Sequence, residues 1–210
     1  MEVSSVFAVL NAIGLFVFAI SGALTAIRQR LDFLSVLIIA FFTGVGGGTI
    51  RDVMLGTFPV WWVNDETAVG ICILGAVVAS FTHRFLWSRQ KALIWADAAG
   101  LSVFAILGAQ SALGAGAPAI VAVFMGGVTA TFGGIIRDVL LNQPSLILKQ
   151  EIYATAALGG AAVYVGLIEL GVSMDVAAIA ASLLTFAIRG SAIVFGVSLP
   201  KLGGDVKRDP

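Results

Sequence analysis

Cysteine and histidine are almost missing from this chain of 210 residues, which has one of each, Cys72 and His83. A disulfide needs two cysteines, and a structural zinc site needs about four Cys or His ligands. The sequence therefore excludes a disulfide framework and a Cys/His metal cluster. It also lacks a Gly-x-Ser-x-Gly motif and a Gly-rich loop that ends in Lys-Ser or Lys-Thr. We expect neither an enzyme nor a bound cofactor.

Charged residues are also scarce, at 11% of the chain, whereas 59% of the residues are hydrophobic. A typical soluble domain is about 25% charged, so this chain has too little polar surface to cover a globule in water. Its twelve basic residues balance twelve acidic ones and form no stripe that could follow a phosphate backbone. We therefore expect the lipid bilayer to be the main partner and nucleic acid not to be one.

Long hydrophobic runs dominate what the chain does contain. A helix needs about 20 mainly apolar residues to cross a bilayer, and seven segments qualify. They lie near residues 6–27, 33–55, 67–85, 92–113, 117–141, 152–170 and 176–198. The sequence predicts an all-α membrane protein with seven transmembrane helices, one transmembrane domain over residues 1–210, and a short polar tail at 201–210.

Basic residues fall in alternate connections between these segments. They are Arg28, Arg30, Arg84, Arg89, Lys91, Lys149, Lys201, Lys207 and Arg208. The positive-inside rule then predicts a multi-pass protein of the cell inner (plasma) membrane, with its N-terminus outside and its C-terminus in the cytoplasm. Tryptophans near the predicted span ends, Trp61 among them, are typical of interfacial anchors.

The chain repeats itself at one ungapped offset. Arg51-Asp52-Val53 recurs as Arg137-Asp138-Val139, a shift of 86 positions (137 − 51 = 86). The same shift relates Val17-Phe18-Ala19-Ile20 to Val103-Phe104-Ala105-Ile106 and Gly47-Gly48 to Gly133-Gly134, so duplication is the best interpretation. Each copy holds three spans, an odd number, so the second copy is inverted. Repeat one covers about 6–85, repeat two about 92–170, and a seventh helix at about 176–198 lies outside both.

Glycine runs precede both Arg-Asp pairs. Each glycine weakens a helix by about 1 kcal/mol relative to alanine, so the runs predict a kink or a locally unwound turn. Such segments line solute pathways in many transporters with inverted repeats. The alternative is that these small residues let two helices approach closely. The glycines concerned are Gly46, Gly47, Gly48, Gly133 and Gly134.

Charges within the spans are expensive, at about 2.5 to 3.5 kcal/mol each, so they are expected to face the interior of the bundle. Adjacent residues of a helix point about 100° apart, which favours a pairing across the repeats, such as Arg51 with Asp138, over a pairing of neighbours. The alternative is that these pairs only pin helix ends. Further polar candidates inside the spans are Asn11, Asp97, Thr43, Thr129 and Arg189.

Seven spans, an inverted duplication and paired Gly-Gly-x-x-Arg-Asp motifs resemble a prokaryotic member of the trimeric intracellular cation (TRIC) channel family. The resemblance implies a homotrimer with one pore per protomer that conducts monovalent cations, mainly potassium. The kinked second and fifth spans would line the pore. The site residues carried over are Gly46, Gly47, Gly48, Arg51, Asp52, Gly133, Gly134, Arg137 and Asp138.

Animal members of the family carry a Lys-Glu-Val signature, in place of Arg137-Asp138-Val139 here, and lipid binding at this motif is left open.

Two alternatives to the channel stay open. The same broad family has carried a glycine-transporter label, so a carrier of small solutes is the rival of the channel. A membrane scaffold without transport would leave the buried charges unexplained.

Overall fold

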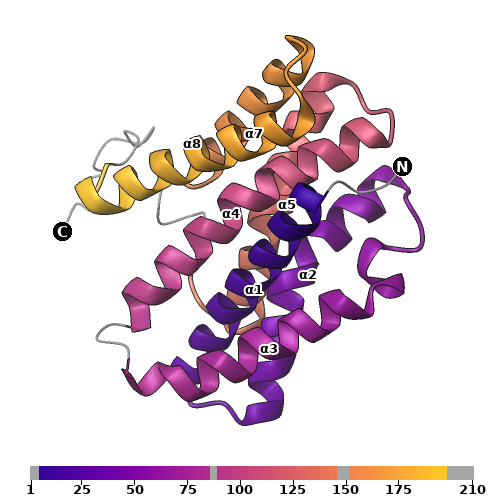
Figure 1. Cartoon of the computed structure of the whole chain (residues 1–210). Coiled ribbons are helices and arrows are strands. Elements are labelled where there is room, and N and C mark those ends of the chain that lie inside the picture. The colour runs from indigo at the N-terminus through magenta and orange to yellow at the C-terminus, as the bar shows by residue number, and fades with distance from the viewer. Residues whose placement is uncertain (1–4, 86–88, 146–151, 198–210) are drawn as a thin grey trace, which may run out of the picture.

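The computed structural model describes residues 5–85, 89–145 and 152–197, and within these ranges the secondary structure consists of helices and their connections. The helices are α1 (Ser5–Arg28), α2 (Phe33–Leu55), η1 (Trp61–Asn64), α3 (Glu66–Thr82), η2 (His83–Phe85), α4 (Arg89–Gly114), α5 (Ala119–Leu140), α7 (Ala154–Glu169) and α8 (Met174–Phe195). Figure 1 shows them packed as one bundle. The prediction of an all-α protein is confirmed.

Six of these helices are long and apolar enough to cross a bilayer: α1, α2, α3 with η2, α4, α5 and α8. The sixth predicted span corresponds to α7, which is apolar but only 16 residues long. At 1.5 Å per residue it reaches about 24 Å, less than the roughly 30 Å of a hydrocarbon core. The seven-helix prediction therefore holds, with a sixth helix shorter than residues 152–170. The predicted tail at 201–210 lies outside the described residues.

Local chemistry explains where α2 begins and ends. The carboxylate of Asp32 accepts a hydrogen bond from the backbone N–H of Ser35, at 2.9 Å, and so caps the first turn. At the other end, Gly56 adopts a left-handed conformation with φ of +67°, which glycine reaches without steric cost. The boundaries of α2 thus agree with the predicted span 33–55.

The inverted repeat is visible in how the helices pack. In the first copy α1 packs against α2 and α3, and in the second α4 packs against α5 and α7. The two copies meet where α1 packs on α4 and α2 on α5. In Figure 1, α1 and α4 lie side by side and run in opposite directions. The helix outside the repeats, α8, packs on α4 and α7 and therefore belongs to the second half of the bundle.

Reciprocal contacts locate a pseudo-two-fold axis between the copies. A Cβ added to Gly47 would overlap the backbone carbonyl of Thr129, and one added to Gly133 would overlap that of Thr43. The rings of Phe18 and Phe104, which are repeat equivalents of each other, have centroids 5.1 Å apart. Exchange of contacts between equivalent residues is the mark of a two-fold relation, and a residue meets its own equivalent only near the axis.

Candidate functional site

The glycine runs allow two helices to cross closely and do not unwind them. Both α2 and α5 continue through their runs as α-helix, so the predicted unwound turn is wrong. The reason is the crossing itself: Gly47 and Gly133 bring the two backbones so near that a methyl group does not fit. Intact helices also keep their backbone groups hydrogen-bonded inside the membrane. Whether the runs kink the helices stays a prediction.

The motif of the first repeat forms a local ion pair. The guanidinium of Arg51 contacts Oδ1 of Asp52 through Nε at 2.8 Å and Nη2 at 2.7 Å. Oδ2 of Asp52 accepts a hydrogen bond from the backbone N–H of Trp61 at 2.9 Å. The predicted pairing of Arg51 with Asp138 is therefore wrong. The long arginine side chain folds back toward its neighbour, which the argument from a 100° separation did not allow for.

The motif of the second repeat builds a larger buried network. Nε of Arg137 contacts Oδ1 of Asp138 at 2.8 Å, as in the first repeat. Its Nη1, however, reaches two other helices and donates to Oδ1 of Asp97 at 2.7 Å and to Oγ of Ser21 at 2.5 Å. The side chains of Arg137 and Asp97 are 0% and 1% exposed. This arginine thus joins α1, α4 and α5 in the interior of the bundle.

Tyr153 covers the network from the N-terminal end of α7. The position that a Cβ of Gly134 would occupy lies 3.0 Å from Oη of Tyr153, 3.4 Å from Oδ1 of Asp97 and 3.5 Å from Nη2 of Arg137. These three polar groups therefore converge on the glycine. On the other side of Tyr153, the guanidinium carbon of Arg189 lies 5.2 Å from its ring centroid, a cation–π contact.

A cavity of about 690 Å³ lies between the ends of α1, α2, α3, α4 and α8 and reaches the motif of the first repeat. The polar side chains that line it are Asn11, Arg51, Trp61, Asp65, Thr67, Gln110, Ser111 and Asp175. Phe104, one ring of the pair on the pseudo-two-fold axis, also lines it. Within the described ranges, no three Asp, Glu, His or Cys side chains converge to hold a metal ion. The cavity can therefore take water and small solutes in contact with charges of both signs.

The secondary candidates separate into three kinds. Asn11 lines the cavity, whereas its repeat equivalent Asp97 belongs to the buried network. Thr43 and Thr129 bond carbonyls of their own helices, those of Ile39 and Met125, and a Cβ at Gly22 would lie 2.5 Å from Oγ1 of Thr43. The two threonines therefore pack helices together, and Arg189 lies over the ring of Tyr153.

Sequence reasoning missed the aromatic residues of the site. Besides its predicted place near a span end, Trp61 has its indole against Gly48, as Tyr153 lies against Gly134, and it lines the cavity. The two aromatic residues follow the motif by different numbers of residues, so the repeat offset does not align them. The contact of Phe18 with Phe104 could have been predicted from the repeat, since the two are equivalent residues within one of its two four-residue matches.

The chain matches the family model described as "Glycine transporter" over residues 8–84 and 94–169. It is 38% identical over 201 residues to the UPF0126 inner membrane protein YadS of Escherichia coli K12, with 93% of this chain and 96% of YadS covered. It is 36% identical over 202 residues to a UPF0126 membrane protein of Vibrio cholerae, with 94% and 83% covered.

The chain is similar in fold to solved structures of TRIC cation channels. The TRIC trimeric intracellular cation channel orthologue of Rhodobacter sphaeroides matches with a TM-score of 0.89 and 43% identity, covering 92% of this chain and all of that one. A TRIC channel from a study of conductance matches at 0.85 with 36% identity, covering 95% and 98%. A prokaryotic TRIC channel crystallised in 0.5 M KCl matches at 0.87 with 30% identity, covering 94% and 100%.

Proposed function

Since the chain belongs to the prokaryotic TRIC family, we propose that it is a monovalent cation channel of a bacterial inner membrane, with potassium as its main permeant ion. The observation that carries the proposal is the likeness to solved cation channels, at 30–43% identity over more than nine tenths of the chain. The name of one matching family model, "Glycine transporter", carries less weight, because the likeness to the solved channels extends over almost every helix.

The cavity is the part of the protein best suited to take up cations. Asp65 and Asp175 line it together with Arg51, and Arg51 is neutralised by its ion pair with Asp52. The carboxylate of Asp65, which accepts hydrogen bonds only from the backbone of α3, therefore gives the cavity a negative charge that raises the local concentration of cations. We assign to the pore the motif residues of both repeats: Gly46, Gly47, Gly48, Arg51, Asp52, Gly133, Gly134, Arg137 and Asp138.

We propose that a pair of aromatic rings forms an apolar constriction between the cavity and the buried network. Phe104 lines the cavity and packs on Phe18, and Phe18 also lies against Gly133 beside the network. Apolar constrictions in channels close by excluding water. We propose that ions pass this pair only when α2 and α5 move apart, and that α2 and α5 line each protomer's own pore.

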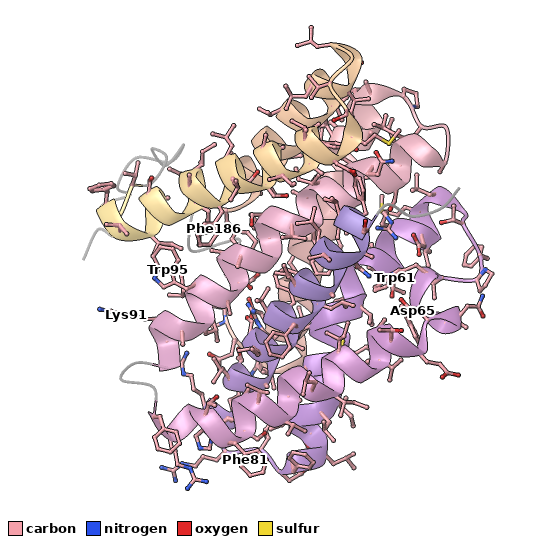
Figure 2. All side chains as sticks on the ribbon, in the orientation of Figure 1. Trp61, Asp65, Phe81, Lys91, Trp95 and Phe186 are labelled. Atoms are coloured by element: carbon pink, nitrogen blue, oxygen red, sulfur yellow. The ribbon has the colours of Figure 1, made fainter. Side chains whose placement is uncertain are left out.

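Orientation and assembly complete the proposal. Figure 2 shows Lys91 at the opposite side of the bundle from Trp61 and Asp65. The basic residues at the end of α1 and the start of α4 would then face the cytoplasm, and the cavity would face outside. Lys149, Lys201, Lys207 and Arg208 lie outside the described residues. The names of the solved relatives support a homotrimer.

Planar bilayer recording tests the channel directly. Purified protein under a potassium chloride gradient is expected to give discrete unitary currents that reverse near the potassium potential. Phe104→Ala is expected to increase the open fraction, because it removes one ring of the constriction. Phe81→Ala serves as the matched control, since that ring lies exposed on α3 and does not line the cavity.

The rival function, a carrier of small zwitterionic solutes, is favoured by the family model's name and by the two signs of charge in the cavity. A carrier saturates and shows counterflow, whereas a channel shows neither at millimolar solute. Saturable uptake of labelled glycine into liposomes, together with bilayers that show no current, would replace the channel by the carrier.

A further inference from the structure

One polar side chain of the cavity wall is held by a helix that lies behind the wall. Gln110, near the end of α4, lines the cavity. Its carbonyl oxygen, Oε1, accepts a hydrogen bond from the hydroxyl of Tyr164 on α7. Tyr164 is buried, and within the described ranges α7 contributes none of the residues that line the cavity. A buried residue of α7 therefore fixes a side chain that faces the solute space.

The nitrogen end of the same carboxamide has a weaker contact. Nε2 of Gln110 lies 3.6 Å from Sδ of Met174, at the start of α8, and a thioether sulfur is only a weak acceptor. Met174 also lines the cavity. The stronger of the two contacts is thus the one that Tyr164 makes with the carbonyl oxygen, and oxygen is the atom with which an amide binds a metal cation.

The first repeat cannot form this bond. The repeat equivalent of Gln110 is Leu24 (110 − 86 = 24), which is 1% exposed and has an apolar side chain. Packing at this position of the repeat therefore does not require an amide. Burial of a polar group costs free energy unless the group is hydrogen-bonded, so a polar pair where the other copy has an apolar residue indicates a role besides packing.

We propose that Tyr164 is a positioning residue for the cavity: its hydroxyl keeps the carbonyl oxygen of Gln110 in a hydrogen bond within the protein, so that cations bind the cavity wall weakly. Conduction requires sites that an ion enters but also leaves readily. A glutamine released from Tyr164 has several rotatable bonds, and its carbonyl is free to turn toward an ion. The inference deepens the proposed cation channel and rests on the cavity being part of its path.

The potassium dependence of thermal unfolding tests this role without requiring a current. A ligand that binds only the folded state stabilises it, and more so the more tightly it binds. Tyr164→Phe keeps the ring and removes the hydroxyl, so potassium chloride is expected to raise the unfolding temperature of this variant more than that of wild type. N-methylglucamine chloride at equal ionic strength is the reference, because it has no metal cation for a carbonyl to coordinate. An equal potassium effect in the two proteins would overturn the proposal.

Gln110→Leu, which installs the residue of the first repeat, makes the test specific. With no carbonyl left to release, Tyr164→Phe is expected to add no potassium dependence in this background. Ser111→Ala changes a neighbouring polar residue of the lining and is the matched control, in which Tyr164→Phe is expected to keep its full effect. If Tyr164→Phe has the same effect in the Gln110→Leu background as in wild type, the hydroxyl does not act through Gln110 and the proposal fails.

Unfolding kinetics test the bond itself. Gln110→Leu leaves the hydroxyl of Tyr164 without its acceptor, so the unfolding half-life of the purified protein is expected to fall about fivefold or more. The double variant with Tyr164→Phe is apolar at both positions and is expected to recover to within about threefold of wild type. A double variant as unstable as the two single losses combined would show that the two side chains are not coupled, which also overturns the proposal.

Bilayer recording extends the test to conduction, and this arm rests on the proposed channel. In Tyr164→Phe the unitary current is expected to reach half of its maximum at a severalfold lower potassium concentration than in wild type, because the cation leaves the wall more slowly. An unchanged concentration would overturn the positioning role. If wild type itself gives no current, the channel fails, while the potassium dependence of unfolding still decides whether Tyr164 weakens cation binding.

Discussion

The two copies of the Arg-Asp motif have the same sequence and opposite surroundings. Arg51 has one ion-pair partner and borders a cavity, whereas Arg137 has three partners on three helices and no exposed surface. Equal motifs therefore do not imply equal roles. The two halves differ at one pair of equivalent positions, which holds the amide of Asn11 in the first repeat and the carboxylate of Asp97 in the second. The duplication preserved the backbone crossing and let the charged interior diverge.

The largest loss of stability is expected when the motif arginine of the second repeat is replaced, and we compare it with the same replacement in the first repeat. Arg137→Met removes the guanidinium that contacts both Asp97 and Asp138 and is expected to cost about 3–5 kcal/mol. Arg51→Met leaves one carboxylate, that of Asp52, which keeps its hydrogen bond from the backbone N–H of Trp61, so it is expected to cost clearly less. Thermal unfolding of the purified variants checks the order. Equal losses would mean that the two sites are electrostatically alike.

The glycines at the crossing are expected to behave alike in the two halves. Gly47→Ala and Gly133→Ala each force a methyl group against a backbone carbonyl of the opposite helix, so each is expected to cost about 1–3 kcal/mol or more. Gly70→Ala is the matched control, because a Cβ at that helix position meets nothing within 4 Å. A loss in only one of the two variants would contradict the pseudo-two-fold axis.

The smallest expected effect is a difference in pH dependence between the first turns of α2 and α5. Asp32 caps α2, and bonds from the backbone and side chain of Ser35 hold the pKa of its carboxylate below the ordinary value of 3.8. The equivalent residue, Pro118, makes no side-chain cap. Because the pKa is lowered in the folded state, the cap stabilises α2 fully at a pH above the ordinary pKa. This stabilisation is lost as the pH falls through the folded-state pKa.

Hydrogen exchange of the first amides of α2 and α5 checks this difference. Protection at the start of α2 is expected to fall below pH 3.8, relative to the unchanged start of α5. Asp32→Asn, which caps without a titrating group, is the control. Persistence of the pH dependence in that variant would show that another group titrates.

Hydrophobic length, charge bias and the 86-residue offset sufficed for the helix count and for the inverted repeat. They also sufficed for which polar positions correspond, since Asn11 and Asp97 match by register. They did not suffice for the partners of Arg51 or Arg137. An arginine side chain has several rotatable bonds, so its helix position leaves open whether it reaches its neighbour, as Arg51 does, or two other helices, as Arg137 does.

The sequence by itself determined that this protein lies in a lipid bilayer, where its helices run, and that they form two copies of one unit. These properties depend on periodicity and hydropathy along the chain. Only the tertiary structure decided which of the two motifs borders a cavity and which is sealed. That distinction arises from Trp61 and Tyr153, residues that reach the motifs from other segments of the chain. Contacts of this kind depend on how helices pack, and no local pattern encodes them.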